Sequence, residues 1–509
     1  MVTTITPQVN LTTRADTDAD QTRASAQLIA NVIDGAEVPA AGGKTFAKLA
    51  PATGEQLSSV ARSGADDIDA AVSAARAAQP AWAGRTVAER GAILRRIAQL
   101  LERDAEAVAA VVAAETGKSP GDAAGEVGAA IEMGYFVAGE GRRFYGRTTT
   151  SAIPHRQAVT IRQPLGVAGL IIAANTPIAN VAWKVFPALL CGNAAVLKAS
   201  EDTPETALVF SRLAAEADLP AGVLNVVNGL GPEAGQPLVE HADVDVVSFT
   251  GSTAVGRMIA SVAGGRMAKV CLELGGKNPL IVCDDADLEG AANAAALSAF
   301  SNAGQRCAAG SRLIAFDSVY DRFRELMLEQ ADAQRVGPGN EHDFGPVINE
   351  RQLEQMLAAV GRAREGGARV IAGGQRLSGE GRDGGFYMAP TLIEDAPADS
   401  DVVCNELFGP IATMHRVSGF DEAIALANAT DYGLTAAIWT DSVHRGQAFV
   451  AAIQSGVASV NGPTYGSEPH MPFGGLGQSG NGFREAGTEA LDVYSDWKTV
   501  YTHHDPARI

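Results

Sequence analysis

Four short and nearly continuous apolar runs constrain the fold of this chain more than any other feature. They occupy residues 167–173, 194–197, 223–227 and 244–249, and helix-forming stretches such as 207–217 separate them. Strands buried on both faces have this pattern, because helices cover both sides of a parallel sheet. The same alternation returns after Leu280. The sequence therefore predicts an α/β fold with a second α/β layer.

Helical periodicity dominates the residues before the first apolar run. An amphipathic helix is predicted where apolar side chains recur at i, i+3 and i+4, at Ile93, Leu94, Ile97, Leu100 and Leu101. An Ala-rich helix is predicted over residues 66–78, and we expect it to stop before Pro80, because proline has no amide hydrogen to donate. Residues 1–24 show no hydrophobic period and are predicted to be a flexible tail.

Residues 146–162 have the character of an exposed strand. Thr148 to Thr150 are followed by the half-apolar stretch Ala158 to Ile161. Such a strand leaves backbone groups unpaired at its edge and needs a partner. We therefore expect this segment to form an arm.

Composition excludes several classes of function. Lys and Arg number 40 against 59 Asp and Glu, a formal charge of −19, which argues against a partner such as nucleic acid or an anionic membrane. Five Cys in 509 residues predict no disulfide framework, and no Cys or His spacing predicts a metal site. The first 25 residues lack an apolar signal segment, and the longest apolar run, about 165–174, is shorter than the ~20 residues of a membrane helix. We expect a cytoplasmic protein.

Two strand ends carry residues suited to a nucleotide. Gly251, Ser252 and Gly256 follow a buried strand and open a helix, where free amides and the helix dipole attract an anion such as a pyrophosphate. An ordinary strand-to-helix turn with a Ser cap explains this segment equally well. Lys198 and Glu201 follow another strand, at the edge of the sheet where ligands bind in open α/β folds. Taken alone, they also fit a solvated loop pair.

Two further residues are candidates for chemistry. Glu273 leads into a Gly-Gly turn, where burial would raise the pKa of its carboxyl toward the range of a general base. Cys307 follows a Gly closely and stands beside Arg306, and a cationic neighbour lowers the pKa of a thiol and activates it as a nucleophile. A surface Glu and a core Cys are the competing interpretations.

Taken together, these segments resemble the NAD(P)-dependent aldehyde dehydrogenase superfamily of the non-acylating type, from about Ile29 to Thr502. The motifs stand in the order of that family. They are Asn175 with Trp183-Lys184 downstream, Leu272-Glu273-Leu274-Gly275-Gly276-Lys277, Phe300-x-Asn302-x-Gly304-Gln305-x-Cys307, Glu406-Leu407-Phe408-Gly409-Pro410 and Pro472-Phe473-Gly474-Gly475.

The resemblance implies NAD-dependent oxidation of an aldehyde to the carboxylic acid through a thiohemiacetal and a thioester. It implies four catalytic residues, namely Cys307 as nucleophile, Asn175 as oxyanion donor, Glu273 as the base for water and Lys184 as a proton relay. It implies NAD contacts from Lys198, Glu201, Gly251, Ser252, Gly256, Leu274, Glu406 and Phe408. The carboxylate of Glu201 would repel a 2′-phosphate, which favours NAD over NADP.

The resemblance also implies a three-part fold. A Rossmann-type NAD-binding domain would use residues 25–145 and 164–274, and an α/β catalytic domain would span 275–475. Residues 146–163 and 490–503 would form a small β oligomerisation arm, with the terminal strand supplied by another subunit. A homodimer or homotetramer is therefore expected.

Two positions depart from the family pattern. Ala173-Ala174 stand where Pro-Trp is usual, which makes a wall near the cofactor smaller. The segment before Glu485 is one residue longer than the common form, so the pattern does not assign Glu485 a role.

The substrate and the competing functions depend on neighbouring residues. Four polar residues favour a polar or acidic semialdehyde, such as a ketoglutaric semialdehyde, as the substrate; they are Thr176, Asn180, Ser301 and Arg306. An aromatic aldehyde is the alternative substrate, because Trp183 and Tyr465 could stack on its ring. The alternatives are a CoA-acylating dehydrogenase, a non-catalytic binding protein on the same fold, and a cofactor-free thiol esterase. Glu273 argues for water over CoA as the acyl acceptor.

Overall fold

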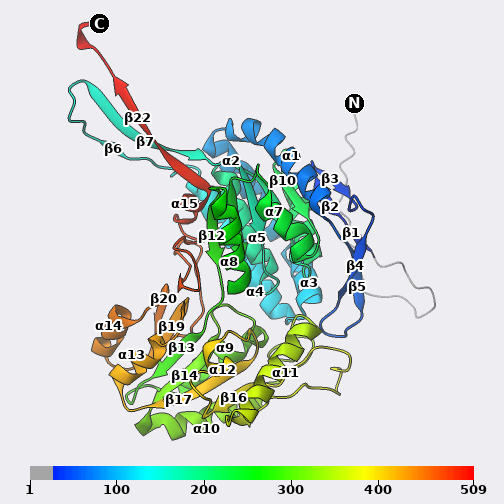
Figure 1. Ribbon diagram of the computed structural model, residues 1–509, viewed down its shortest axis with the longest axis vertical. Coiled ribbons are helices and arrows are strands. Elements are labelled where there is room, and N and C mark those ends of the chain that lie inside the picture. Colours follow the sequence, from blue (N-terminus) through cyan, green and yellow to red (C-terminus); the bar gives the residue numbers. More distant parts are fainter. Residues whose placement is uncertain (1–26, 509) are drawn as a thin grey trace.

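The computed structural model describes residues 27–508, and two seven-stranded sheets form its two main bodies (Figure 1). The chain crosses from the first sheet to the second between β12 (Lys269–Glu273) and β13 (Asn278–Val282). The expected α/β fold with two largely parallel sheets is confirmed. The tail predicted over residues 1–24 lies outside the described residues.

The first sheet holds all four apolar runs. Its spatial order is β12-β11-β8-β9-β10-β2-β3, with β2 and β3 antiparallel at one edge. The remaining strands are β2 (Asn31–Ile33), β3 (Ala36–Val38), β8 (Val167–Ile171), β9 (Ala194–Lys198), β10 (Leu224–Val227) and β11 (Val246–Thr250). In β9, Ala195 and Leu197 belong to one hydrophobic cluster and Ala194 and Val196 to another. Both faces of the strand are therefore covered, which is why the run has no polar alternation.

Helices on each side of this sheet supply the two clusters. Helices α2 to α6 pack on one face, and α1, α7 and α8 pack on the other. Their bounds are α1 (Ala65–Ala83), α2 (Val87–Arg103), α3 (Ala105–Thr116), α4 (Pro120–Glu140), α5 (Pro177–Leu190), α6 (Pro204–Glu216), α7 (Gln236–Glu240), which follows a π-helical turn (Gly231–Gly235), and α8 (Thr253–Gly265).

The expected stop before Pro80 is wrong, because α1 continues to Ala83. A proline removes only the hydrogen bond of its own nitrogen, and the next bonds are intact, since the Gly84 amide donates to the Pro80 carbonyl at 3.0 Å. Tertiary packing holds this last turn. Trp82 is buried, and its indole Nε1 donates to the Leu189 carbonyl at 2.9 Å.

The second sheet has the spatial order β15-β16-β17-β14-β13-β19-β20, with β15 antiparallel at one edge. Its other strands are β14 (Gly310–Phe316), β15 (Arg369–Ala372), β16 (Thr391–Glu394), β17 (Ile411–Val417), β19 (Thr435–Trp439) and β20 (Val457–Val460). Its helices are α9 (Leu288–Phe300), α10 (Asp317–Ala333), α11 (Glu350–Glu365), α12 (Asp401–Cys404), α13 (Phe420–Asn428) and α14 (Val443–Ala452). Helices α9 and α10 pack on one face of this sheet, and α13 and α14 pack on the other.

Three small sheets complete the fold. The first joins β1 (Leu28–Ile29), β5 (Gln56–Ala61) and β4 (Thr45–Leu49), and the second pairs β18 (Tyr432–Gly433) with β21 (Leu476–Gly477). The third projects from the molecule as an arm (Figure 1). It is built from β6 (Thr148–Thr149), β7 (Arg156–Pro164) and β22 (Ser495–His503).

The terminal strand of the arm pairs within its own chain, which corrects the expectation that another subunit supplies it. β22 is antiparallel to β7 over nine residue pairs, from Ser495 opposite Pro164 to His503 opposite Arg156. The preceding helix α15 (Ala490–Tyr494) packs against α5 and β12, although it lies inside the segment predicted as arm. Because α15 leads directly into Ser495, which pairs with Pro164 at the end of β7, the intrachain pairing needs no long connection.

No helix among residues 27–508 combines the length and the apolar character needed to cross a membrane. Cys191, Cys271 and Cys283 are buried and free.

Candidate active site

A cavity of about 900 Å³ lies where the two sheets meet. Its lining includes the loops that follow β8, β11 and β12 in the first sheet, the loops that precede β14 and β17 in the second, and residues of α4, α5 and α11. The lining includes eight predicted site residues, Asn175, Gly251, Ser252, Glu273, Leu274, Cys307, Glu406 and Phe408. Four others, Lys184, Lys198, Glu201 and Gly256, do not line it.

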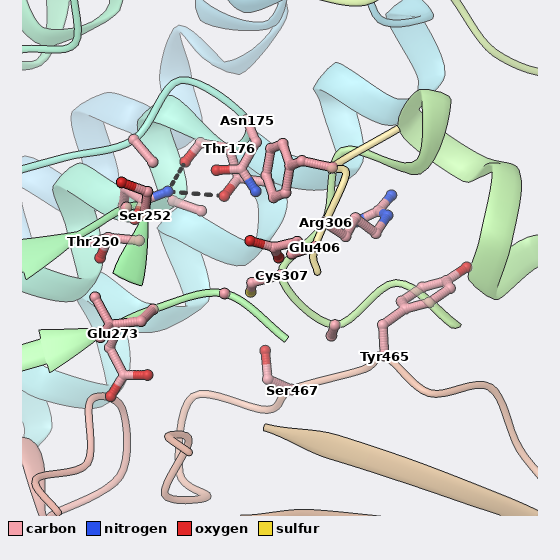
Figure 2. Close-up of a pocket in the computed structure, with 18 of the residues that line it drawn as sticks. Asn175, Thr176, Thr250, Ser252, Glu273, Arg306, Cys307, Glu406, Tyr465 and Ser467 are labelled. Carbon is pink, nitrogen blue, oxygen red and sulfur yellow. Dashed lines mark hydrogen bonds between the residues drawn. The ribbon is translucent and has the colours of Figure 1, made fainter. Parts of the chain in front are cut away.

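Cys307 lies at the centre of this cavity, on a loop fixed from several directions (Figure 2). Its carbonyl accepts a hydrogen bond from Asn278 Nδ2 at 2.8 Å, and Gln305 Oε1 accepts one from the Ile348 amide at 2.9 Å. Gly304 has a φ of +65° and lies so close to Gly409 that a Cβ would come within 2.1 Å of its carbonyl oxygen. Only glycine fits this approach.

The structure contradicts the expectation that the surroundings of Cys307 lower the pKa of its thiol. Burial, together with the nearby Glu406 and Glu273 carboxyls, raises that pKa to about 12, and Arg306 opposes this only weakly. The expectation failed because Arg306, although adjacent to Cys307 in sequence, contacts Tyr465 and Ser301 instead of the sulfur. Its guanidinium carbon lies 4.7 Å from the centre of the Tyr465 ring, and its Nε donates to Ser301 Oγ at 3.2 Å.

Glu273 is buried, and neither of its carboxylate oxygens has a hydrogen-bond partner among residues 27–508. In Figure 2 this carboxylate is turned away from Cys307. Burial and the neighbouring Glu485 carboxylate raise the pKa of Glu273 well above its usual value, while Lys184 and Arg484 oppose the shift. The direction is the one that the sequence argument gave for a general base.

Lys184 and Glu485 form a buried ion pair behind Glu273. Lys184 Nζ lies 2.7 Å and 2.9 Å from the two Glu485 carboxylate oxygens and donates to Ser248 Oγ at 2.8 Å. Glu485 reaches this position because its backbone pairs with Phe473 in both directions. It lines the cavity although Lys184 does not, so the extra residue before Glu485 leaves the side chain at the site.

Asn175 belongs to the segment between β8 and α5, and its side chain faces the same space as Cys307 (Figure 2). Its own carbonyl accepts a hydrogen bond from Lys118 Nζ at 2.7 Å. Lys118 and Glu126 line the cavity, yet sequence reasoning missed both. They belong to a helical hairpin more than 40 residues before Asn175, and no local pattern connects them with it.

The predicted cofactor residues fall into two groups. Glu406 Oε1 accepts the Gly276 amide at 3.0 Å, and a Cβ on Gly275 would lie 2.0 Å from Glu406 Oε2, so this close approach requires glycine. Burial raises the pKa of Glu406 to about 7. Ser252 is the N-cap of α8 but gives it no side-chain hydrogen bond. The first amides of α8 therefore remain available to a ligand.

Lys198 and Glu201 form the second group, at the end of β9 beside β8. Lys198 Nζ lies 3.1 Å from Glu201 Oε2. Burial alone would raise the pKa of Glu201, but the Lys198 ammonium, a backbone hydrogen bond and Arg351 together keep that pKa below its usual value. The Glu201 carboxylate is therefore ionised at neutral pH.

The remaining wall of the cavity is mixed in character. Asn180 Nδ2 donates to Thr176 at 2.9 Å, and Trp183 packs edge-on against Phe473 with 5.5 Å between ring centres. Tyr465 and Ser467 also line the cavity, and of the two Tyr465 lies on the side of Arg306 (Figure 2). Ser301 contacts Arg306 but does not line the cavity.

Comparison with known proteins places this geometry in a family. Residues 37–500 match the Aldehyde dehydrogenase family. The chain belongs to that family. It is 38% identical over 444 residues to the alpha-ketoglutaric semialdehyde dehydrogenase of Bacillus subtilis, covering 87% of this chain and 91% of the relative. The predicted enzyme class, an oxidoreductase acting on the aldehyde group, is therefore confirmed.

Two further matches extend the range of relatives. The chain is 39% identical over 480 residues to the mitochondrial benzaldehyde dehydrogenase of Antirrhinum majus, covering 92% of this chain and 88% of that protein. It also matches the crystal structure of betaine aldehyde dehydrogenase from Staphylococcus aureus in complex with NAD⁺, with a TM-score of 0.91 and 31% identity, covering 94% of this chain and 95% of that one.

Proposed function

We propose that this protein oxidises an acidic semialdehyde to the corresponding dicarboxylic acid, with NAD as hydride acceptor and Cys307 as nucleophile. The observation that carries the reaction class is that Cys307, Asn175 and Glu273 line one cavity together with Glu406 and the start of α8. A cytoplasmic location remains our expectation from the sequence.

The cofactor site fits NAD at three points. The α8 amides beside Gly251 and Ser252 suit a pyrophosphate, the Glu406 carboxylate suits ribose hydroxyls, and ionised Glu201 would repel a 2′-phosphate. Gly256 allows α8 to pack closely against Leu274 beside this site, because a Cβ at position 256 would lie only 2.5 Å from Leu274 Cδ2. NAD, when bound, supplies the acceptor for the hydride that leaves the aldehyde carbon.

The residues of the chain would act in sequence. The Cys307 thiolate attacks the aldehyde carbon, and the Asn175 amide and the Cys307 backbone N–H hold the resulting oxyanion. Loss of a hydride converts this thiohemiacetal into a thioester on Cys307. Glu273 then takes a proton from water, whose oxygen attacks the thioester carbon; the carbon–sulfur bond breaks and releases the carboxylic acid and the Cys307 thiolate. We infer that the proton then passes from Glu273 toward the buried Lys184–Glu485 pair, whose charges act on the Glu273 carboxyl.

Glu273 also argues against the two principal alternatives. A CoA-acylating enzyme needs no base for water, whereas this carboxyl is buried beside the cavity with a raised pKa. A non-catalytic protein would not need to keep Cys307, Glu273 and Asn175 in one cavity.

Arg306 supports the substrate class. Its guanidinium lines the cavity next to the nucleophile, held by Tyr465 and Ser301, and it forms no ion pair among the described residues. A cation fixed in this way recognises a carboxylate. The similarity to an alpha-ketoglutaric semialdehyde dehydrogenase agrees with an acidic substrate. Tyr465 and Trp183 would suit an aromatic aldehyde, as does the similarity to a benzaldehyde dehydrogenase.

We further propose that residues 25–145 and 164–274 form the NAD-binding domain, residues 275–475 the catalytic domain, and the arm an oligomerisation element of a dimer or tetramer. The arm exposes Ile161, Trp497 and Tyr501. Exposed apolar side chains and a free strand edge favour association with another subunit.

The first experiment measures NADH formation with an acidic semialdehyde and with benzaldehyde, in the wild type, Cys307→Ala and Arg306→Met. We expect no turnover in Cys307→Ala. We expect Arg306→Met to lower kcat/KM for the semialdehyde by about 10- to 100-fold, because a charge-assisted contact contributes roughly 1.5–3 kcal/mol, and to leave benzaldehyde unchanged. Preferred oxidation of benzaldehyde by the wild type would contradict the proposed substrate. Acyl-CoA formation on adding CoA would favour the acylating alternative.

A further inference from the structure

Lys118 and Glu126 form one of the most buried ion pairs of the described residues, and it stands in the wall of the active-site cavity. Lys118 Nζ lies 2.5 Å from Glu126 Oε2, and the two side chains are 3% and 5% exposed. Removing two charges from water costs several kcal/mol per ion unless further hydrogen bonds compensate. The other hydrogen bonds of Lys118 and Glu126 therefore indicate which segment of the chain this ion pair holds in place.

Every further hydrogen bond that the two side chains make within the described residues goes to the segment that carries Asn175. Lys118 Nζ donates to the Asn175 carbonyl at 2.7 Å. Glu126 Oε1 accepts the amides of Ile178 at 2.9 Å and Ala179 at 3.3 Å, in the first turn of α5. The segment is thus held at the backbone of Asn175 itself and again where α5 begins.

The same carbonyl connects Asn175 with the loop of the nucleophile. Asn302 Nδ2, five residues before Cys307, lies 3.4 Å from the Asn175 oxygen. Lys118 itself is fixed by a tight turn between two helices. Gly117 ends α3 with a φ of +75°, and the Ser119 side chain caps α4 by accepting the Asp122 amide at 3.1 Å.

We propose that Lys118 and Glu126 are positioning residues that set the Asn175 side-chain amide against the oxyanion at Cys307. This inference rests on the proposed role of Asn175 in the reaction. An oxyanion donor must already stand at its working position, because its contribution depends on a preorganised distance to the developing charge. Asn175 has no regular secondary structure of its own, and the pair formed by Lys118 of the α3–α4 turn and Glu126 of α4 supplies that order.

The test compares kcat in four proteins, namely the wild type, Lys118→Met/Glu126→Gln, Asn175→Ala and the triple variant. The double variant leaves no charge buried without a partner, and the amide oxygen introduced by Glu126→Gln would still accept the α5 amides, so we expect the chain to fold. We expect Asn175→Ala to lower kcat about 10²- to 10³-fold. We expect the double variant to lower it about 10- to 100-fold, as misplacement of a catalytic group does.

The decisive comparison is the effect of the double substitution in the Asn175→Ala background. If the pair acts through Asn175, the substitution lowers kcat no further there, whereas a general structural effect would add in full. The rate of Cys307 alkylation by iodoacetamide, which develops no oxyanion, should stay within about twofold of the wild type. Additive effects, or an equal loss of alkylation, would overturn the proposal.

Glu115→Gln provides a matched control. Glu115, in the last turn of α3, is also a buried carboxylate that accepts amides at the start of another helix. These are the α6 amides of Glu205 at 2.7 Å and Thr206 at 2.9 Å, not groups of the Asn175 segment. We expect its kcat to equal that of the wild type. If Asn175→Ala retains full kcat, the oxyanion role and this inference both fail. If Asn175→Ala loses activity and the double variant does not, only this inference fails.

Discussion

The reactivity of Cys307 follows from the groups that share its cavity. Because burial and the Glu406 and Glu273 carboxyls raise the pKa of this thiol to about 12, only a small fraction is thiolate at neutral pH in the cofactor-free protein. We expect the rate of alkylation by iodoacetamide to rise about tenfold per pH unit between about pH 7 and 9, since the thiolate fraction does so below the pKa. A rise that levels off toward pH 9 would show a thiol of ordinary or lowered pKa.

Two single substitutions separate the contributions of Glu406 and Arg306 to the pKa of the Cys307 thiol. In Glu406→Gln the carboxylate charge disappears while the amide oxygen can still accept the Gly276 N–H, so alkylation at about pH 8 should become faster. In Arg306→Met a weak cationic contribution is lost, and the rate should fall only slightly.

The sequence identifies the reacting residues, but it does not reveal the surroundings that set their pKa values. The sequence motifs around Cys307 and Glu273 identified both residues, because each motif contains a functional group that the reaction needs. Their pKa values depend on which side chains arrive from distant segments. Arg306 is adjacent in sequence yet turns to Tyr465, whereas Glu406 comes from a loop far along the chain and faces the thiol. The Lys118–Glu126 pair could not be predicted either, because it contacts the Asn175 segment from a distant part of the sequence.

Helix α8 offers a test at the scale of a single element, because it carries two glycines with different surroundings. A Cβ on Gly256 would meet Leu274 Cδ2 at 2.5 Å, whereas one on Gly264 would meet nothing within 4 Å. We expect Gly256→Ala to lower the free energy of unfolding by about 1–3 kcal/mol through overpacking, and to weaken NAD binding because Leu274 and the start of α8 move.

Gly264→Ala is the control for this prediction on the same helix. Alanine favours a helix over glycine by about 0.5–1 kcal/mol, so this variant should be equally or slightly more stable and should bind NAD unchanged. Chemical denaturation and calorimetric titration with NAD measure both quantities. Equal behaviour of the two variants would mean that contact with Leu274 does not restrict Gly256.

Elements differ in how far the sequence predicts them. The strands of the first sheet were predictable because burial on both faces leaves an unbroken apolar run, as in β9. The end of α1 was not, because Trp82 and its bond to the Leu189 carbonyl hold a turn that the proline alone would weaken. The expected partner of the arm was wrong as well, since α15 brings β22 beside β7 of the same chain.

The arm determines the prediction for the whole molecule. With β22 already paired inside the chain, the surface left for another subunit is the free edge of β22 and the apolar side chains Ile161 and Tyr501, which are 46% and 56% exposed. Placing charges there should prevent association without unfolding the chain, because neither side chain belongs to a hydrophobic core. We expect the wild type to be a dimer or tetramer by light scattering and Ile161→Glu/Tyr501→Glu to be smaller.

Thr502→Glu tests whether any charge on the arm has this effect, since it adds a carboxylate to an exposed polar position of the same strand. Its mass should equal that of the wild type. If the active site is complete within one chain, as the cavity lining indicates, the smaller species should also keep its kcat per subunit. A wild type that is monomeric at micromolar concentration would contradict the proposed role of the arm. A variant that dissociates and loses NAD binding would instead mean that a neighbouring subunit supports the cofactor site.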